Sequence, residues 1–229
     1  MPDSYKPVTI QTILFDLDGT LADTAPDPAD ALNQVLVDHG KQALAFEDIR
    51  PAASHGSPAL IKLGFNLLPD DSGYNAIRDQ LLSIYAHNIA VKTRLFPGMS
   101  ELLSTITQRR MKWGVVTNKP AFLTEPLLEA LAIAKHAACI VSGDTLPQRK
   151  PDPAPLIHAC QLSASKVAQC IYVGDAERDI QAGRRAGMKT LVALFGYLAP
   201  HDQPETWQAD GMIESPAQIM DWLEQQNLV

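Results

Sequence analysis

Short apolar runs rich in β-branched residues recur along the chain and are separated by stretches with helical spacing of apolar positions. The apolar runs cover residues 8–15, 113–117, 139–142, 170–173 and 190–195. The helix-like stretches cover residues 98–109, 121–131, 152–162 and 177–186. Strands that alternate with helices in this way are typical of a parallel sheet with helices on both faces. We therefore predict an α/β fold with a Rossmann-like parallel-sheet core.

Residues 23–94 break this alternation, because their apolar positions follow helical spacing, as in 77–85, without a strand-like run. A helical block inserted directly after the first strand predicts a second, smaller α-helical domain at residues 22–94. The larger domain would then comprise residues 1–21 and 95–229. Residues 196–211 contain two prolines and three acidic residues, which predict a long surface loop.

The composition is that of an ordinary globular chain. Its 229 residues are 46% hydrophobic and 20% charged, which allows a sizeable core. Since 19 Lys+Arg stand against 26 Asp+Glu, the formal net charge is −7, and no basic stretch favours nucleic acid bound through its phosphates. No apolar run approaches the roughly 20 residues of a membrane span. We therefore expect neither a nucleic-acid nor a membrane partner.

The cysteines and the first residues bear on the compartment. Cys139, Cys160 and Cys170 make no metal-binding spacing, and one thiol would be left over if two paired. Residues 1–7 lack the basic-then-apolar order of a signal peptide. A reducing cytoplasm is the simplest expectation, for a monomer or a homodimer.

Two carboxylates end the first apolar run, where Asp16 and Asp18 are followed by Gly19. Side chains two residues apart point the same way along a strand. Two like charges at so short a distance are costly unless a cation lies between them or one of them carries a proton. A strand-end turn closed by Asp-Gly is the structural alternative. The recurrence of polar residues after other strands favours a functional site.

Three further polar groups follow strands or precede a helix. Thr117 ends the run 113–117, Asp175 follows 170–173 with Asp179 four residues later, and Lys150 precedes the sequence Pro-Asp-Pro. Within that sequence, Asp152 is expected to cap a helix whose first residue is Pro153. Because the carboxyl ends of parallel strands meet at one edge of a sheet, these groups are expected to meet Asp16 and Asp18 there. Carboxylates with a hydroxyl and an ammonium suit magnesium together with a phosphate.

Four segments taken in order resemble the motifs of the haloacid dehalogenase (HAD) superfamily. They are Asp-Leu-Asp-Gly-Thr at 16–20, Val-Thr-Asn at 116–118, Lys-Pro-Asp-Pro at 150–153 and Gly-Asp-Ala-Glu-Arg-Asp at 174–179. The resemblance covers nearly the whole chain, since the helical insert falls where that superfamily places its first cap domain. Within it, the chain is similar to the phosphoglycolate phosphatases and to the N-acetylmuramic acid 6-phosphate phosphatases.

The resemblance implies a Mg²⁺-dependent phosphatase of small phosphate monoesters, of the phosphoglycolate type, with the muramyl sugar phosphate as the alternative substrate. Asp16 would be the nucleophile that becomes an aspartyl-phosphate, and Asp18 the general acid and base. Thr117 and Lys150 would hold the phosphate oxygens. The further implied phosphate contacts are Gly19 and Asn118. The implied metal ligands are Asp16, Asp18 through its main-chain carbonyl, Asp175 and Asp179.

The helical cap is expected to choose the substrate. Ser54, His55 and Gly56 precede an apparent helix, so the free N–H groups of its first turn could face an anionic substrate. Phosphoglycolate phosphatases usually carry an Arg directly after a Gly-rich turn in this region, and this chain has none there. Arg50 and Lys62 are expected to be solvated charges.

Other reactions of the same superfamily are alternatives. The haloalkanoate dehalogenases and phosphonoacetaldehyde hydrolases lack an acid at the position of Asp18, so that residue argues against both. A phosphomutase of the β-phosphoglucomutase type, a pyrophosphatase and a non-catalytic binding protein on the same core stay open.

Overall fold

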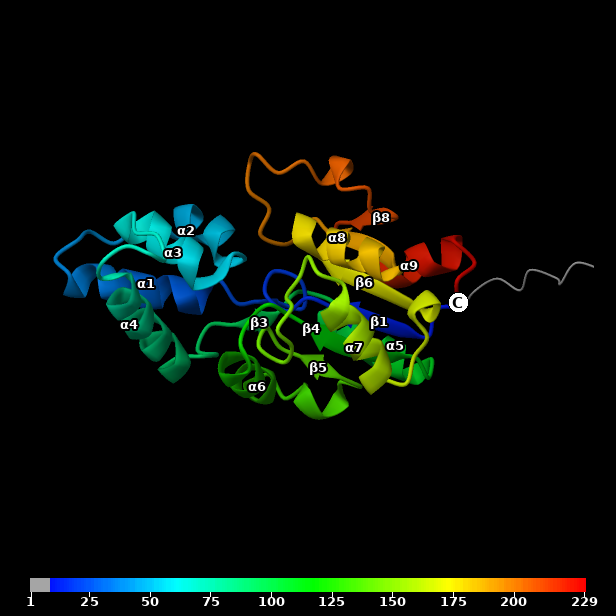
Figure 1. Cartoon of the computed structure of the whole chain (residues 1–229). Coiled ribbons are helices and arrows are strands. Elements are labelled where there is room, and N and C mark those ends of the chain that lie inside the picture. The colour runs from blue at the N-terminus through cyan, green and yellow to red at the C-terminus, as the bar shows by residue number, and fades with distance from the viewer. Residues whose placement is uncertain (1–8) are drawn as a thin grey trace, which may run out of the picture.

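A six-stranded parallel sheet forms the centre of the computed structural model, which describes residues 9–229 (Figure 1). Val8 of the predicted first strand and the N-terminal residues 1–7 lie outside this described part. The strand order is β5-β4-β1-β6-β7-β8. The strands are β1 (Thr12–Phe15), β4 (Lys112–Val116), β5 (Ile140–Val141), β6 (Cys170–Gly174), β7 (Lys189–Ala193) and β8 (Gly211–Ile213).

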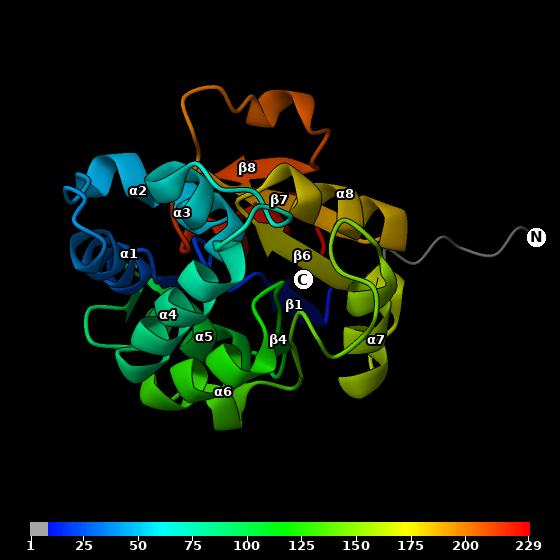
Figure 2. The ribbon, with the colours of Figure 1, turned by 60° about the vertical axis from the view of Figure 1, so that its left-hand side comes forward.

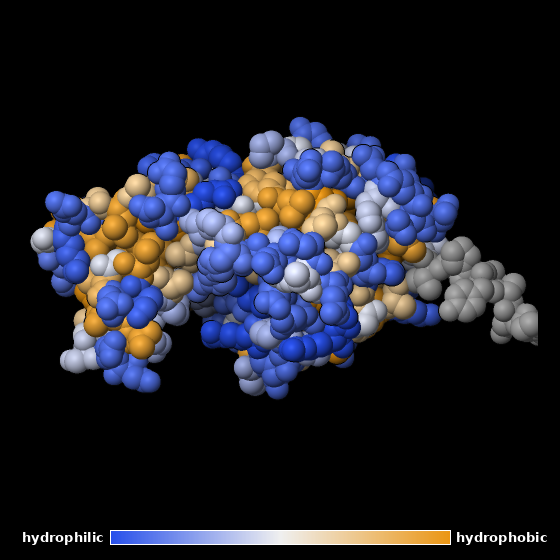
Figure 3. Space-filling model, turned by 90° about the horizontal axis from the view of Figure 1, so that it is seen from above, coloured by the Kyte–Doolittle hydropathy of each residue, from blue (hydrophilic) through white to orange (hydrophobic). Residues whose placement is uncertain are grey.

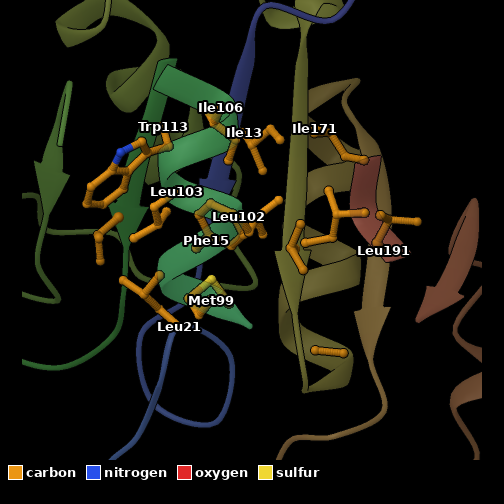
Figure 4. Close-up of a cluster of buried hydrophobic side chains, with 14 of the residues drawn as sticks. Ile13, Phe15, Leu21, Met99, Leu102, Leu103, Ile106, Trp113, Ile171 and Leu191 are labelled. Atoms are coloured by element: carbon orange, nitrogen blue, oxygen red, sulfur yellow. The ribbon is translucent and has the colours of Figure 1, made fainter. Parts of the chain in front are cut away.

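Helices cover both faces of the sheet, as the alternating pattern predicts. They are α5 (Met99–Gln108), α6 (Ala121–Ala130), α7 (Ala154–Leu162), α8 (Glu177–Ala186) and α9 (Gln218–Gln225). Ile13 and Phe15 of β1 pack with α5 in one buried cluster (Figure 4), to which α9 also contributes. Leu14 packs with α7 and α8 in another. This alternation follows from the two-residue repeat of a strand that is buried on both faces.

The C-terminal part differs from the sequence-based expectation. The loop predicted at residues 196–211 leads into an additional edge strand, β8, and then into α9. Within that loop Tyr197 and Trp207 are 3% and 7% exposed, so two aromatic side chains anchor it to the core. A three-residue strand lacks enough positions to show period-two alternation, which is why β8 escaped prediction.

Four helices precede β3 and form a separate hydrophobic cluster, here called the helical cap. They are α1 (Pro26–Asp38), α2 (Phe46–Ala53), α3 (Gly56–Phe65) and α4 (Tyr74–His87). Figures 1 and 2 show the cap beside the core, beyond the carboxyl ends of the strands. Its cluster includes Leu32, Ile61 and Leu81, which are at most 1% exposed. Figure 3 shows further apolar residues on the cap surface.

Two short chain segments join the cap to the core. β2 (Ala22–Asp23) pairs antiparallel with β3 (Arg94–Leu95), an element that the expectation of helices alone did not include. The buried carboxylate of Asp27 accepts hydrogen bonds from the main-chain N–H groups of Lys92 and Thr93 and from the Thr93 hydroxyl, at 2.6–2.9 Å. These bonds therefore hold the segment that leaves the cap against the segment that enters it. Across residues 9–229, no helix has both the length and the apolar character needed to cross a membrane.

Candidate active site

The end of β1 brings the first predicted residues together at the centre of the sheet. Asp16 directly follows β1, and its N–H donates to the Val173 carbonyl of β6 at 2.9 Å. β1 lies between β4 and β6, so Thr117 after β4 and Asp175 after β6 flank Asp16 on its two sides. All three side chains are buried, with 2–3% of each residue exposed. The expected meeting of strand ends is therefore present in the fold.

Lys150 places its ammonium among these carboxylates. Its Nζ lies 2.8 Å from Oδ1 of Asp16, 2.8 Å from Oδ1 of Asp179 and 2.8 Å from the hydroxyl of Tyr172. The amide of Asn118 holds the Lys150 main chain, since it accepts from Lys150 N and donates to Lys150 O at 3.0 Å each. The Asn118 side chain, expected to bind phosphate, thus positions the lysine.

Three carboxylates form a cluster that fits a hard divalent cation. One oxygen each of Asp16, Asp175 and Asp179 lies within 4.8 Å of the other two, and all three residues are buried. Burial, followed by the charges of Asp16 and Asp179, raises the pKa of Asp175 to about 8. Oδ1 of Asp16 and of Asp179 contact Lys150, yet neither accepts a hydrogen bond of regular geometry from the described residues. Three buried carboxyl groups against one ammonium make a set of oxygen donors that suits a magnesium-like ion, and such an ion would favour their ionised form.

Asp175 is oriented by two neighbours and needs a glycine beside it. The main-chain N–H of Tyr197 donates to its Oδ2 at 2.8 Å, and the Thr20 hydroxyl donates to its Oδ1 at 3.2 Å. Gly19 has a φ of +85°, and a Cβ there would lie 2.2 Å from Asp175 Oδ2. The glycine of the first motif is therefore required by the close approach of this carboxylate.

Asp18 points away from the carboxylate cluster and has its own cation. Its Oδ1 accepts from Lys119 Nζ at 2.8 Å and from the Thr24 hydroxyl at 2.6 Å. The Lys119 ammonium also lies 4.7 Å from the ring centroid of Tyr85, which belongs to the cap. Burial lowers the pKa of Lys119, but the Asp18 carboxylate and Tyr85 together more than offset this and hold that pKa above its usual value. The expected metal contact of Asp18 uses its main-chain carbonyl, so it would not occupy the side chain that is proposed to transfer a proton.

Main-chain N–H groups add a positive lining around Asp16. Within residues 9–229, the N–H groups of Leu17, Asp18 and Asn118 donate to no acceptor. They follow the carboxyl ends of the adjacent strands β1 and β4. Unpaired N–H groups gathered in this way are a binding site for an anion such as phosphate.

The cap loop contacts the core through an arginine. Arg178, the second residue of α8, donates to the Ser54 carbonyl at 2.8 Å and to the Ser54 hydroxyl at 2.9 Å, and its Nη1 lies 3.0 Å from His55 Nδ1. Burial, and then the charge of Arg178, lowers the pKa of His55. A neutral imidazole can accept this hydrogen bond. Gly56 begins α3 with a φ of +70°, as expected of a turn before a helix.

Two sequence-based expectations about charges and caps are corrected. Arg50 is not a solvated charge, because it donates to the carbonyls of Gly196 and Phe195 and lies 4.8 Å from the Tyr197 ring centroid. Lys62 is exposed, as expected. Helix α7 begins at Ala154 instead of Pro153. Asp152 still accepts from the N–H of Ala154 at 2.8 Å, so it caps the helix from one position further out.

Several residues of the site were not assigned a role from the sequence. They are Tyr85, Lys119, Tyr172, Arg178 and Tyr197. Lys119 and Arg178 lie inside or next to the polar motifs, so their position was a usable signal. The aromatic residues look like core positions in the sequence, and only tertiary contacts reveal the hydrogen bonds of Tyr172 and Tyr197 and the ring contact of Tyr85 with Lys119.

The chain belongs to the haloacid dehalogenase-like hydrolase family, whose model matches residues 13–193. It is 39% identical over 210 residues to the N-acetylmuramic acid 6-phosphate phosphatase of Pseudomonas putida, a match that covers 92% of this chain and 94% of the relative. It is also 39% identical over 209 residues to the phosphoglycolate phosphatase of Xanthomonas campestris, covering 91% and 94%.

Solved structures agree with this assignment. A crystal structure of a "predicted phosphoglycolate phosphatase" from Haemophilus somnus superposes with a TM-score of 0.83 at 26% identity, covering 93% of this chain and 97% of that one. CbbY from Rhodobacter sphaeroides, crystallised with phosphate, superposes with a TM-score of 0.75 over 92% and 96% of the two chains at 22% identity, which supports the fold alone. The expected superfamily and fold class are confirmed.

Proposed function

We propose that this chain is a phosphatase that hydrolyses small-molecule phosphate monoesters through an aspartyl-phosphate on Asp16. One observation carries the proposal: the buried Asp16 carboxylate lies 2.8 Å from Lys150 Nζ, beside main-chain N–H groups that have no acceptor among residues 9–229. A nucleophile next to a cradle for the phosphate oxygens is the arrangement that phosphoryl transfer needs, because that chemistry depends mainly on positioning and charge stabilisation.

The residues around Asp16 divide the remaining work. Asp16 would attack phosphorus, while Thr117 and Lys150 hold the equatorial oxygens and offset their growing charge. Asp18 would donate its proton to the leaving alcohol and later take one from the water that cleaves the aspartyl-phosphate. The ion pair with Lys119 supports this role, because it fixes the Asp18 carboxylate on the side of the site that faces the cap.

Mg²⁺ is the cofactor that best fits the carboxylate cluster. Asp16, Asp175 and Asp179 would hold it, together with the main-chain carbonyl of Asp18. When bound, the ion offsets repulsion between the nucleophile and the phosphate. Thr20 and the Tyr197 N–H keep Asp175 oriented for this purpose.

The proposed substrate is phosphoglycolate or a similarly small ester. A cavity of about 300 Å³ lies where the cap loop meets the core, and it reaches Asp175. This volume is at the low end for ligand sites, which run from ~300 to 1,000 Å³. N-acetylmuramic acid 6-phosphate is the second candidate, because the relative from Pseudomonas putida bears that name at 39% identity. Residues 22–94 would act as the cap domain that closes over either ester, and residues 1–21 and 95–229 as the catalytic core.

Phosphate release from a panel of esters with Mg²⁺ tests the proposal. Phosphoglycolate, the muramyl sugar phosphate, β-glucose 1-phosphate and pyrophosphate make up the panel. We expect phosphate from at least one monoester, with phosphoglycolate favoured. Conversion of glucose 1-phosphate to glucose 6-phosphate without phosphate release would instead identify a mutase, and no turnover of any compound would leave a binding protein.

A further inference from the structure

An arginine of the core lines the cavity at the cap loop. Arg178 is partly buried and projects from the first turn of α8. The cavity has a volume of about 300 Å³ and is bounded from the cap by Ser54 and His55. It also reaches Asp175, one of whose oxygens lies within 4.8 Å of an oxygen of Asp16. The arginine thus lies beside the place where the leaving group of a substrate on Asp16 would extend.

The guanidinium keeps hydrogen-bonding capacity after its contacts with the cap. An arginine has five N–H donors, and three of those of Arg178 go to the Ser54 carbonyl, the Ser54 hydroxyl and His55. Within residues 9–229 the Nε–H and one Nη1–H donate to no acceptor. The Ser54 hydroxyl accepts from Arg178, so its own proton is also free to be donated.

Among the described residues Arg178 makes no direct ion pair, although, against the effect of burial, the charges of Asp179, Asp16 and Asp175 raise its pKa. No Asp or Glu oxygen of the described residues lies within 4.0 Å of its nitrogen atoms. The two other acids that line the cavity have partners of their own. Glu177 accepts from the Gln181 side chain, and Asp202 accepts from the Ala199 N–H. A guanidinium with free donors and no carboxylate in direct contact, at the wall of a cavity, is suited to a planar anion.

We propose that Arg178, together with Ser54 and His55 of the cap loop, binds a carboxylate on the leaving group of the substrate. The enzyme would then prefer phosphate monoesters whose alcohol carries a carboxylate over those whose alcohol is neutral. This inference rests on the proposed phosphatase function and names its substrate class. Phosphoglycolate and N-acetylmuramic acid 6-phosphate are unlike in size but share this feature. The arginine missing after the cap-loop turn in the sequence is replaced here by one from the core.

The test compares pairs of esters in which one member carries a carboxylate and the other lacks the group that bears it. Phosphoglycolate is paired with 2-hydroxyethyl phosphate, and N-acetylmuramic acid 6-phosphate with N-acetylglucosamine 6-phosphate, which lacks the lactyl group. Because charge-assisted hydrogen bonds to the carboxylate would be lost, kcat/KM of the wild-type enzyme should be about 10- to 100-fold higher for the acidic member of at least one pair. Equal values, or a preference for the neutral member in both pairs, would overturn the inference.

A variant assigns the preference to the arginine. Arg178→Met should lower kcat/KM for the preferred acidic ester about 10- to 100-fold and that for its neutral counterpart less than about threefold. Arg184→Met is the matched control, since it removes the same charge from an exposed position of the same helix. It should leave the ratio unchanged.

The outcomes distinguish a wrong substrate class from a wrong phosphatase function. Equal proportional losses on both esters in Arg178→Met would mean that the arginine only fastens the cap to the core, and would overturn the inference. If that variant does not fold, the wild-type ratio alone decides. Absence of phosphate release from every ester would contradict the phosphatase function itself, whereas turnover without a carboxylate preference contradicts only the substrate class.

Discussion

Replacing Lys150 by methionine would remove the ammonium that contacts the buried carboxylates of Asp16 and Asp179. The Lys150 side chain is 1% exposed, and the side chains of its partners Asp16 and Asp179 are 3% and 0% exposed. Breaking a buried ion pair by deleting one partner costs about 3–5 kcal/mol, because the other charge stays buried without compensation. The total stability of a domain is about 5–15 kcal/mol, so Lys150→Met should stay folded with a much reduced free energy of unfolding.

The assay is urea unfolding at pH 8 in chelator, followed by tryptophan fluorescence, to which buried Trp113 and Trp207 contribute. Lys189→Met is the control, because Lys189 pairs with Asp210 at the surface with 51% of its side chain exposed. Such a pair contributes at most about 1 kcal/mol. Added Mg²⁺ should stabilise Lys150→Met more than the control, since it supplies the missing positive charge.

The stability difference between Lys150→Met and the wild type should depend on pH in a definite direction. Burial raises the pKa of Asp16, whereas the charge of Lys150 lowers it, so the variant should have a still higher Asp16 pKa. A carboxyl group whose folded pKa lies above the unfolded value of 3.8 destabilises the fold increasingly as pH rises through that range. The gap between variant and wild type should therefore narrow between pH 8 and pH 5. If Lys150→Met loses no more free energy of unfolding than Lys189→Met at both pH values, the stabilising role given to Lys150 is refuted.

Three other perturbations test separate contacts. Gly19→Ala places a Cβ 2.2 Å from Asp175 Oδ2, so turnover should fall at least ~10-fold with a raised Mg²⁺ requirement; normal metal dependence would contradict the close approach. In NMR titrations His55 should have a pKa below 6.5, and this pKa should rise in Arg178→Met because the neighbouring positive charge is gone; an unchanged pKa would contradict the contact between His55 and Arg178. Tyr197→Phe deletes a buried hydroxyl that donates to Asp23 at 2.7 Å and accepts from the Ala25 N–H at 2.8 Å, so the free energy of unfolding measured by thermal unfolding should fall by about 1 kcal/mol. An unchanged stability would contradict these two bonds.

The core of the fold and the centre of the site were readable from the sequence because both depend on local order. Each polar motif directly follows a strand or precedes a helix, and the right-handed crossover of parallel strands leaves one edge where such residues meet. Asp16, Thr117 and Asp175 flank one another for that reason. Periodicity sufficed for the main helices, whose predicted ends lie within two residues of those found.

The contacts that join cap and core could not be derived in this way. Arg178 and Ser54 are 124 residues apart, and no sequence pattern states that a core helix reaches a cap loop. Arg50 looked like a solvated charge because its acceptors, the carbonyls of Phe195 and Gly196, come from a loop that propensity leaves undefined. β2 and β3 have two residues each, too few for any periodic signal.

The most direct test of the central claim is detection of a phosphate group on Asp16 during turnover. In Asp18→Asn, p-nitrophenyl phosphate should still react, because its leaving group needs no proton, while the second step slows for lack of a base. The account predicts a burst of nitrophenol of up to one equivalent per enzyme and, after acid quench, a hydroxylamine-sensitive phosphate on the peptide that contains Asp16. Asp16→Asn should show neither. Steady turnover without a burst or label, or a label on another residue, would contradict the covalent mechanism.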